Sequence, residues 1–430
     1  MYRFLARRLP AALACLVVLS AGVDAGPGAG GGNTHTALLM PDGTVWTAGG
    51  NLNGELGDGT SQSSLARKQV LAGATSIAVG GSHTLAVVGG QVFGWGTGNF
   101  GQLGDGTGAG RNVPTVSPLL SDVSQVAAGN VFSLALHPNG TVHAFGYNFS
   151  DGIGDGSTLQ RLTPVLVSGL SDAVKIAAGV NHALAIRANG TVVAWGNNQF
   201  GKLGDGTTTT RLTPVAVTGL SNIIAVAAAQ ESSLALDSAG HVWAWGTGFY
   251  GVLGQGNTAN SSTPVQIPSL SNVTAIAAGR SHAVALAGTT VWTWGSNAVG
   301  QLGIGAVPSQ TVPVQVQGLN VISAIGTAQN ATFAFAADNG VWGWGDGVGL
   351  GDGTLDRRYT PIVLADGGGI WRIATPQFSL LGGPRSAPVT VLITSATPGA
   401  TVRYTTSGAI PTESDAPVPV GGLLIDRRRP

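Results

Sequence analysis

The sequence predicts an all-β protein: a seven-bladed β-propeller with four-stranded antiparallel blades, followed by a short β-rich C-terminal tail. Three observations predict this fold. The glycine-rich segment at 194–207, AWGNNQFGKLGDGT, occurs in seven related copies, and their ends recur every 47 to 50 residues. The runs between the copies have the length and apolar patterning of β-strands, and no helical periodicity of useful length is present. Four-stranded units repeated at this period are typical of β-propellers. The copies end at Thr60, Thr107, Ser157, Thr207, Asn257, Ala306 and Thr354.

The first element is a predicted secretory signal peptide over residues 1–25. Arg3, Arg7 and Arg8 form a basic start, the apolar run 9–22 is too short to span a bilayer, and small residues precede Gly26. We therefore expect a secreted, periplasmic or cell-surface protein without membrane insertion. The single cysteine, Cys15, lies inside the signal, so we expect the mature protein to have no disulfide and no thiol chemistry.

One repeat unit shows the expected strands. A β-branched run at 213–220 is followed by an apolar run at 222–229, and alternating runs follow at 232–237 and 241–246. Tight-turn dipeptides link the third and fourth runs in several units, as two-residue hairpins require. These dipeptides are Asp42-Gly43, Asn139-Gly140, Asn189-Gly190 and Asn339-Gly340. A large aromatic residue opens the glycine-rich segment, and we expect it to pack between blades and to donate to a backbone carbonyl. The aromatic residues assigned to this position are Trp46, Trp95, Phe145, Trp195, Trp245, Trp294 and Trp344.

The ends of the repeat array predict how the ring closes. The first unit starts at its third strand, near Asn33, with no strand recognised before it, whereas the last unit continues through 360–375. We expect this C-terminal pair of strands to complete the first blade, so that the ring interlocks and leaves no unpaired edge. An abutting ring, in which each blade is self-contained, is the alternative. The propeller is assigned to residues 26–376.

The repeat resembles that of the regulator of chromosome condensation family. The resemblance lies in AAGVNHALAI at 177–186 and AWGNNQFGKLGDG at 194–206, and it extends over about residues 32 to 375. It implies a seven-bladed propeller. The founding members of the family are guanine-nucleotide exchange factors for a small GTPase. The propeller is also similar to secreted bacterial β-lactamase inhibitors, which bind their target through one propeller face.

The C-terminal part, residues 377–430, resembles a partial chitobiase C-terminal-like β module. The similarity lies in 387–414, where Tyr404 to Thr412 match the module's marker, with Ser407 at the position of its usual Asp. We expect residues 377–430 to contain only the first half of the module. In that family the module is an accessory unit and not a catalytic centre.

Two sets of repeated polar residues are expected to be structural. His35, His83, His182 and His282 recur in phase and are expected to hydrogen-bond to backbone between strands. An Arg follows the loop Asp by six residues in four units, and it is absent where the Asp is absent, which predicts Asp–Arg pairs that pin the loop. The pairs are Asp105 with Arg111, Asp155 with Arg161, Asp205 with Arg211 and Asp352 with Arg358; the first unit has Ser64 at that offset from Asp58.

The sequence favours a binding protein over an enzyme. Charged residues are 9% of the chain against a usual ~25%, and 20 basic residues balance 20 acidic ones, which gives no footprint for nucleic acid. No catalytic, metal or cofactor site is predicted. We expect a monomeric, exported scaffold that binds a protein or an envelope polymer through loops on one face. An enzyme with a site in the central channel and a nucleotide exchange factor are the alternatives. The candidate binding rim comprises Phe100, Phe149, Phe200, Phe249 and Tyr250.

Overall fold

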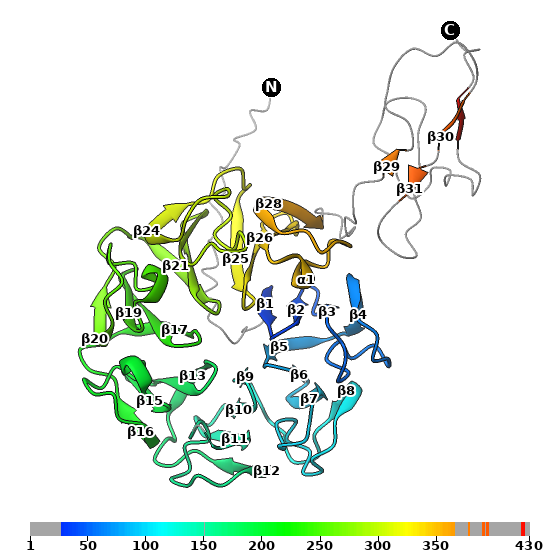
Figure 1. The fold of residues 1–430 in the computed structure, drawn as a ribbon. Helices are drawn as coiled ribbons and strands as arrows, with labels where there is room; N and C mark the ends of the chain where they lie inside the picture. Colours follow the sequence, from blue (N-terminus) through cyan, green and yellow to red (C-terminus); the bar gives the residue numbers. More distant parts are fainter. Residues whose placement is uncertain are drawn as a thin grey trace, which may run out of the picture.

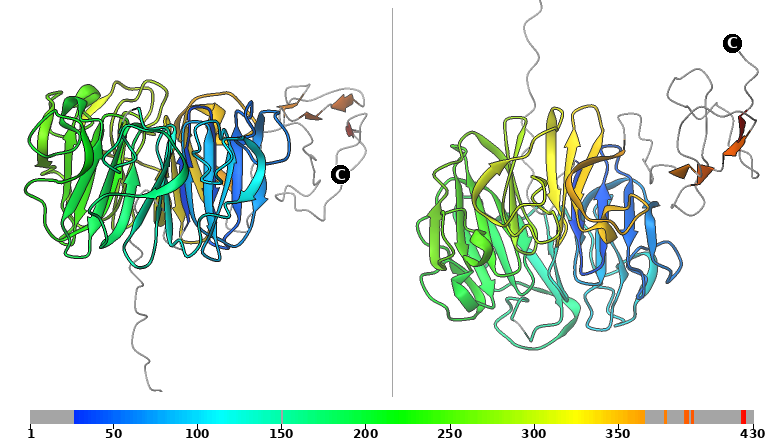
Figure 2. Two further views of the ribbon diagram at one scale, coloured as in Figure 1. Left: turned by 90° about the horizontal axis from the view of Figure 1, so that it is seen from below. Right: turned by 45° about the horizontal axis from the view of Figure 1, so that its top comes forward.

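The predicted seven-bladed propeller is confirmed. The computed structural model describes residues 27–149 and 151–365, together with the backbone of four short strands further on. Within these residues seven four-stranded antiparallel sheets surround a central channel (Figure 1). The ring is a disc whose strands run between two faces (Figure 2). The predicted signal peptide, residues 1–25, lies outside the described residues.

The seven blades share one strand order, with the first strand innermost and the fourth outermost. Blades one to four are β1 (Gly28–Gly31), β2 (His35–Leu39), β3 (Val45–Gly49), β4 (Ser64–Leu71); β5 (Ala74–Val79), β6 (His83–Val88), β7 (Gln91–Gly96), β8 (Arg111–Val116); β9 (Gln125–Ala128), β10 (Phe132–Leu136), β11 (Val142–Gly146), β12 (Arg161–Leu166); and β13 (Ala173–Ala178), β14 (His182–Arg187), β15 (Val192–Gly196), β16 (Arg211–Ala216). Blades five to seven are β17 (Ile223–Ala228), β18 (Ser232–Asp237), β19 (Val242–Gly246), β20 (Ser261–Gln266); β21 (Val273–Ala278), β22 (His282–Ala287), β23 (Thr290–Gly295), β24 (Gln310–Gln315); and β25 (Ile322–Thr327), β26 (Ala331–Ala336), β27 (Val341–Gly345), β28 (Arg358–Ala365). The short helical turns are η1 (Gln199–Gly201), η2 (Phe249–Gly251) and α1 (Gly347–Leu350).

Outermost strands carry a proline in six of the seven blades. Proline lacks the N–H that an incoming strand would need, so it protects an exposed sheet edge from pairing with another chain. This accounts for the repeated Thr-Pro-Val and related runs. The prolines are Pro114, Pro164, Pro214, Pro264, Pro313 and Pro361.

The expected interlocking closure is wrong. The first blade is complete, because Gly28–Gly31 form its innermost strand and pair with β2. The segment at 358–365 is the outermost strand of the last blade and pairs with β27. Each blade is therefore one continuous stretch of chain, and the ring closes by packing of the first blade against the last. The sequence GAGG has no alternation of apolar and polar residues, so the first strand could not be recognised from its pattern. The rest of the segment expected to close the ring, residues 366–376, lies outside the described residues.

The glycine-rich loop is packed between neighbouring blades. Its Leu is buried in each blade, with Ile153 in its place in the third. In the first six blades the glycine after it lies against the aromatic residue of the next blade. A Cβ on Gly204 would stand 2.8 Å from the Nε1 atom of Trp245, so only glycine fits there without movement. The Trp245 Nε1–H donates to the backbone carbonyl of Lys202 at 2.8 Å, as expected for this position. The loop thus contributes buried, closely packed residues to the interface between neighbouring blades.

The assignment of Trp46 to this aromatic position is wrong. The register of β2 and β3 places Ala48 at the position that Trp195 has in its blade, and Trp46 lies two residues earlier. Since the first blade has only a methyl group there, the space beside Gly351 of the last blade is occupied by Arg67. Arg67 is buried and donates to the carbonyls of Gly349 and Leu350 at 3.1 and 3.0 Å. A buried arginine therefore stabilises the junction at which the ring closes.

Four short strands are described beyond the propeller: β29 (Gln377–Phe378), β30 (Val389–Val391), β31 (Ile393–Thr394) and β32 (Leu423–Ile425). β29 pairs with β31, and β30 pairs with β32, both antiparallel. The marker segment of the chitobiase-like resemblance, 404–412, lies outside the described residues.

Candidate binding face

The long loops of all seven blades open on one face of the disc. In each blade the third strand ends, and the second and fourth strands begin, at the same edge of the sheet; Gly196, for example, pairs with both His182 and Arg211. We call the face at this edge the loop face. The opposite face, which carries the tight hairpins and the links between blades, is the turn face. All five predicted rim aromatics belong to loops of the loop face.

Phe100 and Phe149 lie on either side of a tyrosine that the sequence reasoning missed. The rings of Phe100 and Tyr147 have centroids 4.7 Å apart, and Tyr147 stacks on Phe149 at 6.1 Å. Phe149 is 81% exposed, whereas Phe100 is half-buried. The three rings form one continuous cluster over the second and third blades. Tyr147 follows Phe145-Gly146, where other blades have a small or polar residue, and this departure from the repeat was the available signal.

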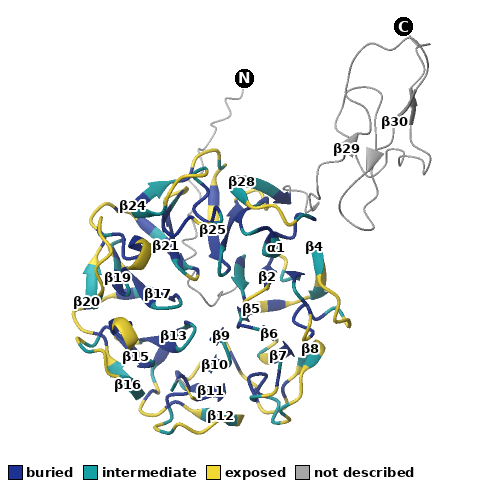
Figure 3. Ribbon diagram, in the orientation of Figure 1, coloured by how far each residue is buried: buried dark blue, intermediate teal, exposed yellow. Residues whose placement is uncertain are grey.

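The other rim aromatics lie in the fourth and fifth blades. Phe249 and Tyr250 contact one another edge to face, with centroids 4.5 Å apart, and Phe249 is 64% exposed. Phe200 and Tyr250 have φ values of 68° and 60°, a left-handed conformation that bulky residues rarely adopt. Their short helical turns project from the ring as exposed segments (Figure 3). Backbone strain of this kind, of order 1–3 kcal/mol, concentrates at binding sites.

Leu52 adds an exposed apolar side chain on the first blade. It is 85% exposed and occupies the position that Phe149 and Phe249 have in their blades. The set formed by Leu52, Tyr147 and the five predicted aromatics is named the loop-face rim. Large exposed apolar side chains gathered on one face are typical of a protein-binding surface.

Asp–Arg pairs hold the loops of Phe100, Phe149 and Phe200, as predicted, whereas the loop of Phe249 and Tyr250 has Gln255 and Ser261 at the two positions. Arg211 donates to Asp205 from Nε at 2.8 Å, and the other Oδ of Asp205 accepts from the backbone and hydroxyl of Thr207. Burial alone would raise the pKa of Asp205, but the hydrogen bonds from Thr207 and Arg211 outweigh burial and lower it. The equivalent pairs at Asp105, Asp155 and Asp352 are present. In the first blade, Asp58 pairs instead with Lys68, a partner ten residues away that the six-residue spacing could not reveal.

The recurring histidines are structural, but their partner is a hydroxyl of the next blade and not backbone. His83 Nε2 lies 2.8 Å from the Ser133 hydroxyl, which donates to the carbonyl of Gln102 at 2.8 Å. Because the hydroxyl proton is committed to that carbonyl, the hydroxyl oxygen must accept from His Nε2–H. The same arrangement links His182 to Ser233 and His282 to Thr332. His35 contacts Thr84 in the same way.

Burial keeps these imidazoles neutral. It lowers the pKa of His35 to about 4 and the pKa values of His83 and His282 to about 3, and it lowers that of His182 well below its usual value. The sequence shows traces of this pairing. Phe132 and Ser232 replace the histidine in the third and fifth blades, and in the next blade the hydroxyl residue is replaced by Ala183 and Ala283, respectively. Within the described residues no three His, Cys, Asp or Glu side chains gather in a metal-binding group.

Glu231 of the fifth blade pairs with Lys202 of the preceding blade. Lys202 is fully buried, and its burial lowers its pKa against the opposing effect of Glu231. In the first, second and sixth blades, Glu55, Gln102 or Gln301 at this position accepts from a loop N–H two residues earlier. The Lys202 ammonium group can only donate, so it cannot accept from the N–H of its own loop. It needs an acceptor from elsewhere, and the carboxylate of Glu231 is that acceptor.

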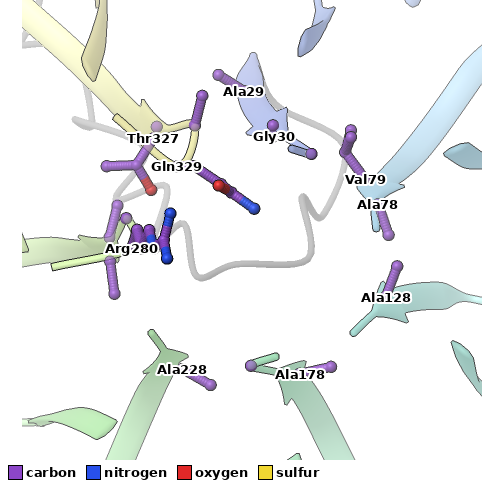
Figure 4. Close-up of a pocket in the computed structure, with 18 of the residues that line it drawn as sticks. Ala29, Gly30, Ala78, Val79, Ala128, Ala178, Ala228, Arg280, Thr327 and Gln329 are labelled. Atoms are coloured by element: carbon purple, nitrogen blue, oxygen red, sulfur yellow. The ribbon is translucent and has the colours of Figure 1, made fainter. Parts of the chain in front are cut away.

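The central channel opens on the loop face with a volume of about 350 Å³ (Figure 4). Its wall consists mainly of glycine and alanine from the innermost strands. Backbone hydrogen bonds link successive blades around the mouth, such as Asn33 N–H to Gly81 O at 2.9 Å and Gly81 N–H to Asn130 O at 2.9 Å. Arg280 is the one charged side chain among the described residues that line the channel. No helix in the described ranges has the length and apolar character needed to cross a membrane.

A family model described as RCC1-like domain matches residues 28–324. Among curated proteins, the human E3 ubiquitin-protein ligase HERC2 is 38% identical over 124 residues, which are 27% of this chain and 3% of the ligase. The ultraviolet-B receptor UVR8 of Arabidopsis thaliana is 32% identical over 124 residues, 27% of this chain and 28% of the receptor. The matched region thus spans less than a third of either relative.

Solved structures share the fold. Human WBSCR16 superposes with a TM-score of 0.67 at 21% identity, covering 75% of this chain and 93% of that one. Yeast RCC1 (Prp20), in a crystal structure with Kap60 bound to it, has a TM-score of 0.67 at 22% identity, covering 85% of this chain and 91% of that one. At this identity the likeness concerns the fold.

Proposed function

The chain belongs to the family of RCC1-like domains, and we propose that it is an exported, non-catalytic scaffold that binds a partner protein through the loop-face rim. Yeast RCC1 (Prp20) is a propeller of this fold that binds another protein, Kap60. Export is proposed from the basic and apolar character of residues 1–25.

The observation that carries this proposal is the exposure of large apolar side chains on ordered loops. Phe149 and Phe249 each present most of their ring to solvent. An Asp–Arg pair holds the loop of Phe149, and in the loop of Phe249 the Gln255 amide donates to the backbone carbonyls of Leu253 and Gln266. Rigid aromatic side chains lose little conformational entropy on binding and supply much of the energy of protein interfaces. A rim already held in place is suited to dock a partner with little rearrangement.

The channel lining supports binding over catalysis. Its described residues include Arg280 and several amide side chains, but no carboxylate, histidine or cysteine that could serve as a general base or nucleophile. The polar residues at the mouth do differ from blade to blade, which is the feature that an enzyme would show. Without a proton acceptor among them, their chemistry is that of recognition.

Affinity capture tests the proposal. Full-length protein and a Phe149→Ser/Phe249→Ser variant would be used as baits in the exported fraction of the producing cells, with bound proteins quantified by mass spectrometry. We expect one or more proteins retained by the wild type to be depleted at least ~10-fold by the variant, the effect of ~1.4 kcal/mol. Val321→Ser, which removes an exposed apolar side chain from the turn face, is the matched control. Retention that is equal for all three baits would contradict the proposal.

A further inference from the structure

The mouth of the central channel is chemically uneven. One residue from each blade follows the innermost strand and forms the ring around the opening: Asn33, Gly81, Asn130, Val180, Gln230, Arg280 and Gln329. On one side of the ring, blades five, six, seven and one contribute Gln230, Arg280, Gln329 and Asn33. On the other side the larger part of the wall is backbone and small side chains. The backbone at the mouth is nearly the same in all seven blades. The difference in polarity between the two sides of the opening therefore comes from the side chains.

The walls below the mouth are lined by glycine backbone and alanine methyl groups, with Thr327 among them. Ala78, Ala128, Ala178 and Ala228 present only methyl groups to the channel, whereas Gln329 reaches over the opening beside Arg280 of the neighbouring blade (Figure 4). The volume of about 350 Å³ lies in the range of small-molecule pockets. A ligand that fits would be slim and apolar along its body and polar at its end.

Two hydrogen bonds within the ring use the amide oxygens of Gln230 and Asn33. Arg280 Nε donates to Gln230 Oε1 at 2.6 Å, and Gln329 Nε2 donates to Asn33 Oδ1 at 2.6 Å. Among the described residues, the NH₂ groups of Gln230 and Asn33 and the terminal nitrogens of Arg280 have no recorded acceptor and can donate to a ligand. A cluster with spare donors and one positive charge is complementary to an anion with two acceptor oxygens.

Arg280 differs from the loop arginines in having no carboxylate partner among the described residues. Arg111, Arg161, Arg211 and Arg358 are each paired with an aspartate. The acid nearest in sequence to Gln230 is Glu231, and it is paired with Lys202. The charge of Arg280 is thus not neutralised by a carboxylate at the channel mouth.

We propose that the channel mouth binds a small monocarboxylate with a short apolar body. The carboxylate is held by the guanidinium of Arg280 and the neighbouring amide NH₂ groups of Gln230 and Asn33. The apolar body lies along the alanine methyl groups of the channel. This site is separate from the loop-face rim, and its occupation does not depend on the proposed partner protein.

Isothermal titration calorimetry of the full chain with hexanoate and with hexanamide tests the site. The two probes share a body and differ in charge, so hexanoate should bind saturably with one site per chain and at least ~10-fold more tightly than hexanamide. Arg280→Gln should weaken hexanoate binding at least ~10-fold without changing its weak affinity for hexanamide. Arg280→Lys should recover part of the loss, because the charge is kept but the two-pronged geometry is lost.

Two further variants make the result decisive. Ala178→Leu narrows the channel below the mouth and should weaken hexanoate binding while Arg280 stays in place. Arg357→Gln removes an exposed arginine outside the channel lining and should leave binding unchanged. Melting temperatures of all variants are measured in parallel to confirm folding. Equal affinity for the two probes, no saturable binding of hexanoate, or binding that survives Arg280→Gln overturns the proposal.

Discussion

Arg67 of the first blade lies over the ring of Phe333 in the last blade, with its guanidinium carbon 5.2 Å from the ring centroid. Other blade junctions have a tryptophan packed on a loop glycine, or Phe145 in one case, but this junction has Ala48 and a buried arginine. Arg67 also contacts the Thr36 hydroxyl, which itself donates to Gly349 O at 2.6 Å. Burial lowers the pKa of Arg67 to about 9, which leaves it charged at neutral pH. A buried arginine therefore takes the place of the aromatic side chain at the junction where the ring closes.

Arg67→Ala is expected to destabilise the ring by about 3 kcal/mol or more. The substitution leaves the buried carbonyl of Leu350 without its Arg67 donor, at a cost of about 1–3 kcal/mol, and opens a cavity that adds to the loss, while Thr36 still donates to Gly349 O. Urea unfolding followed by tryptophan fluorescence measures the loss. Arg357→Ala, at an exposed arginine of the last blade, is the control and should stay within ~0.5 kcal/mol of wild type. Equal stability of the two variants would show that Arg67 does not hold the junction.

The Asp205–Arg211 pair is expected to stabilise its loop modestly. The side chain of Arg211 is 34% exposed, so solvent screening limits the coupling energy to about 0.5–1 kcal/mol. A double-mutant cycle with Asp205→Asn and Arg211→Gln, measured by chemical denaturation, isolates this term. The coupling should fall as salt is raised from low to high concentration. A coupling of zero at low salt would contradict the role given to these pairs.

The four buried histidines are expected to make stability depend on pH between about 6.5 and 4.5. Their folded-state pKa values lie below the unfolded value of 6.5, so the unfolded chain binds protons that the folded chain does not. Stability is therefore fully present above pH 6.5 and is lost as the pH falls toward the folded pKa values, with a slope of up to about 1.4 kcal/mol per pH unit for each histidine. Denaturation midpoints at pH 7.5, 6.0 and 4.5 measure the slope.

A His83→Gln variant separates this effect from that of the carboxylates. The Gln amide can still donate to Ser133 but does not titrate, so the slope between pH 6.5 and 4.5 should fall by about one proton. Aspartates whose pKa values are lowered, such as Asp155, contribute only at lower pH, below about 3.8. A slope identical to that of the wild type would mean that His83 is not held neutral.

Phe200→Asn/Tyr250→Asn is expected to reduce binding without reducing stability. Both residues have positive φ, a conformation that asparagine adopts at lower cost than an aromatic residue, so the free energy of unfolding should stay level or rise by about 1 kcal/mol. Loss of two exposed rings should weaken the interaction with the captured partner. A variant that is clearly less stable, or that keeps full binding, would contradict a functional reason for the backbone strain.

The repeat predicted the architecture because the same strand pattern occurs seven times. Positions that depart from the repeat could not be predicted in this way. Gly28–Gly31 form a strand only because β2 lies beside them, and nothing in GAGG indicates it. Ala48 lacks the ring of its equivalents, so the neighbouring Trp46 was assigned in its place. By contrast, the six-residue spacing of Asp205 and Arg211 predicted their contact, because both belong to one loop.

Contacts between blades were harder to predict because they join residues 29 to 51 positions apart. The histidine–hydroxyl pairs are visible in the repeat once blades are compared at neighbouring positions, as are Lys202 and Glu231. Five of the seven rim residues could be named from their place before the loop turn, but Leu52 and Tyr147 were missed. Their exposure depends on the loop conformation, which the residue types alone do not determine.

The most direct test of the account is site-specific photo-crosslinking in the producing cells. A photoreactive phenylalanine analogue placed at Phe149 or Phe249 should yield a crosslink to the same partner protein, because both side chains project from the loop face. The analogue at Val321 on the turn face should yield none. Crosslinks to that partner from Val321, with none from Phe149 or Phe249, would show that the loop face is not the binding surface.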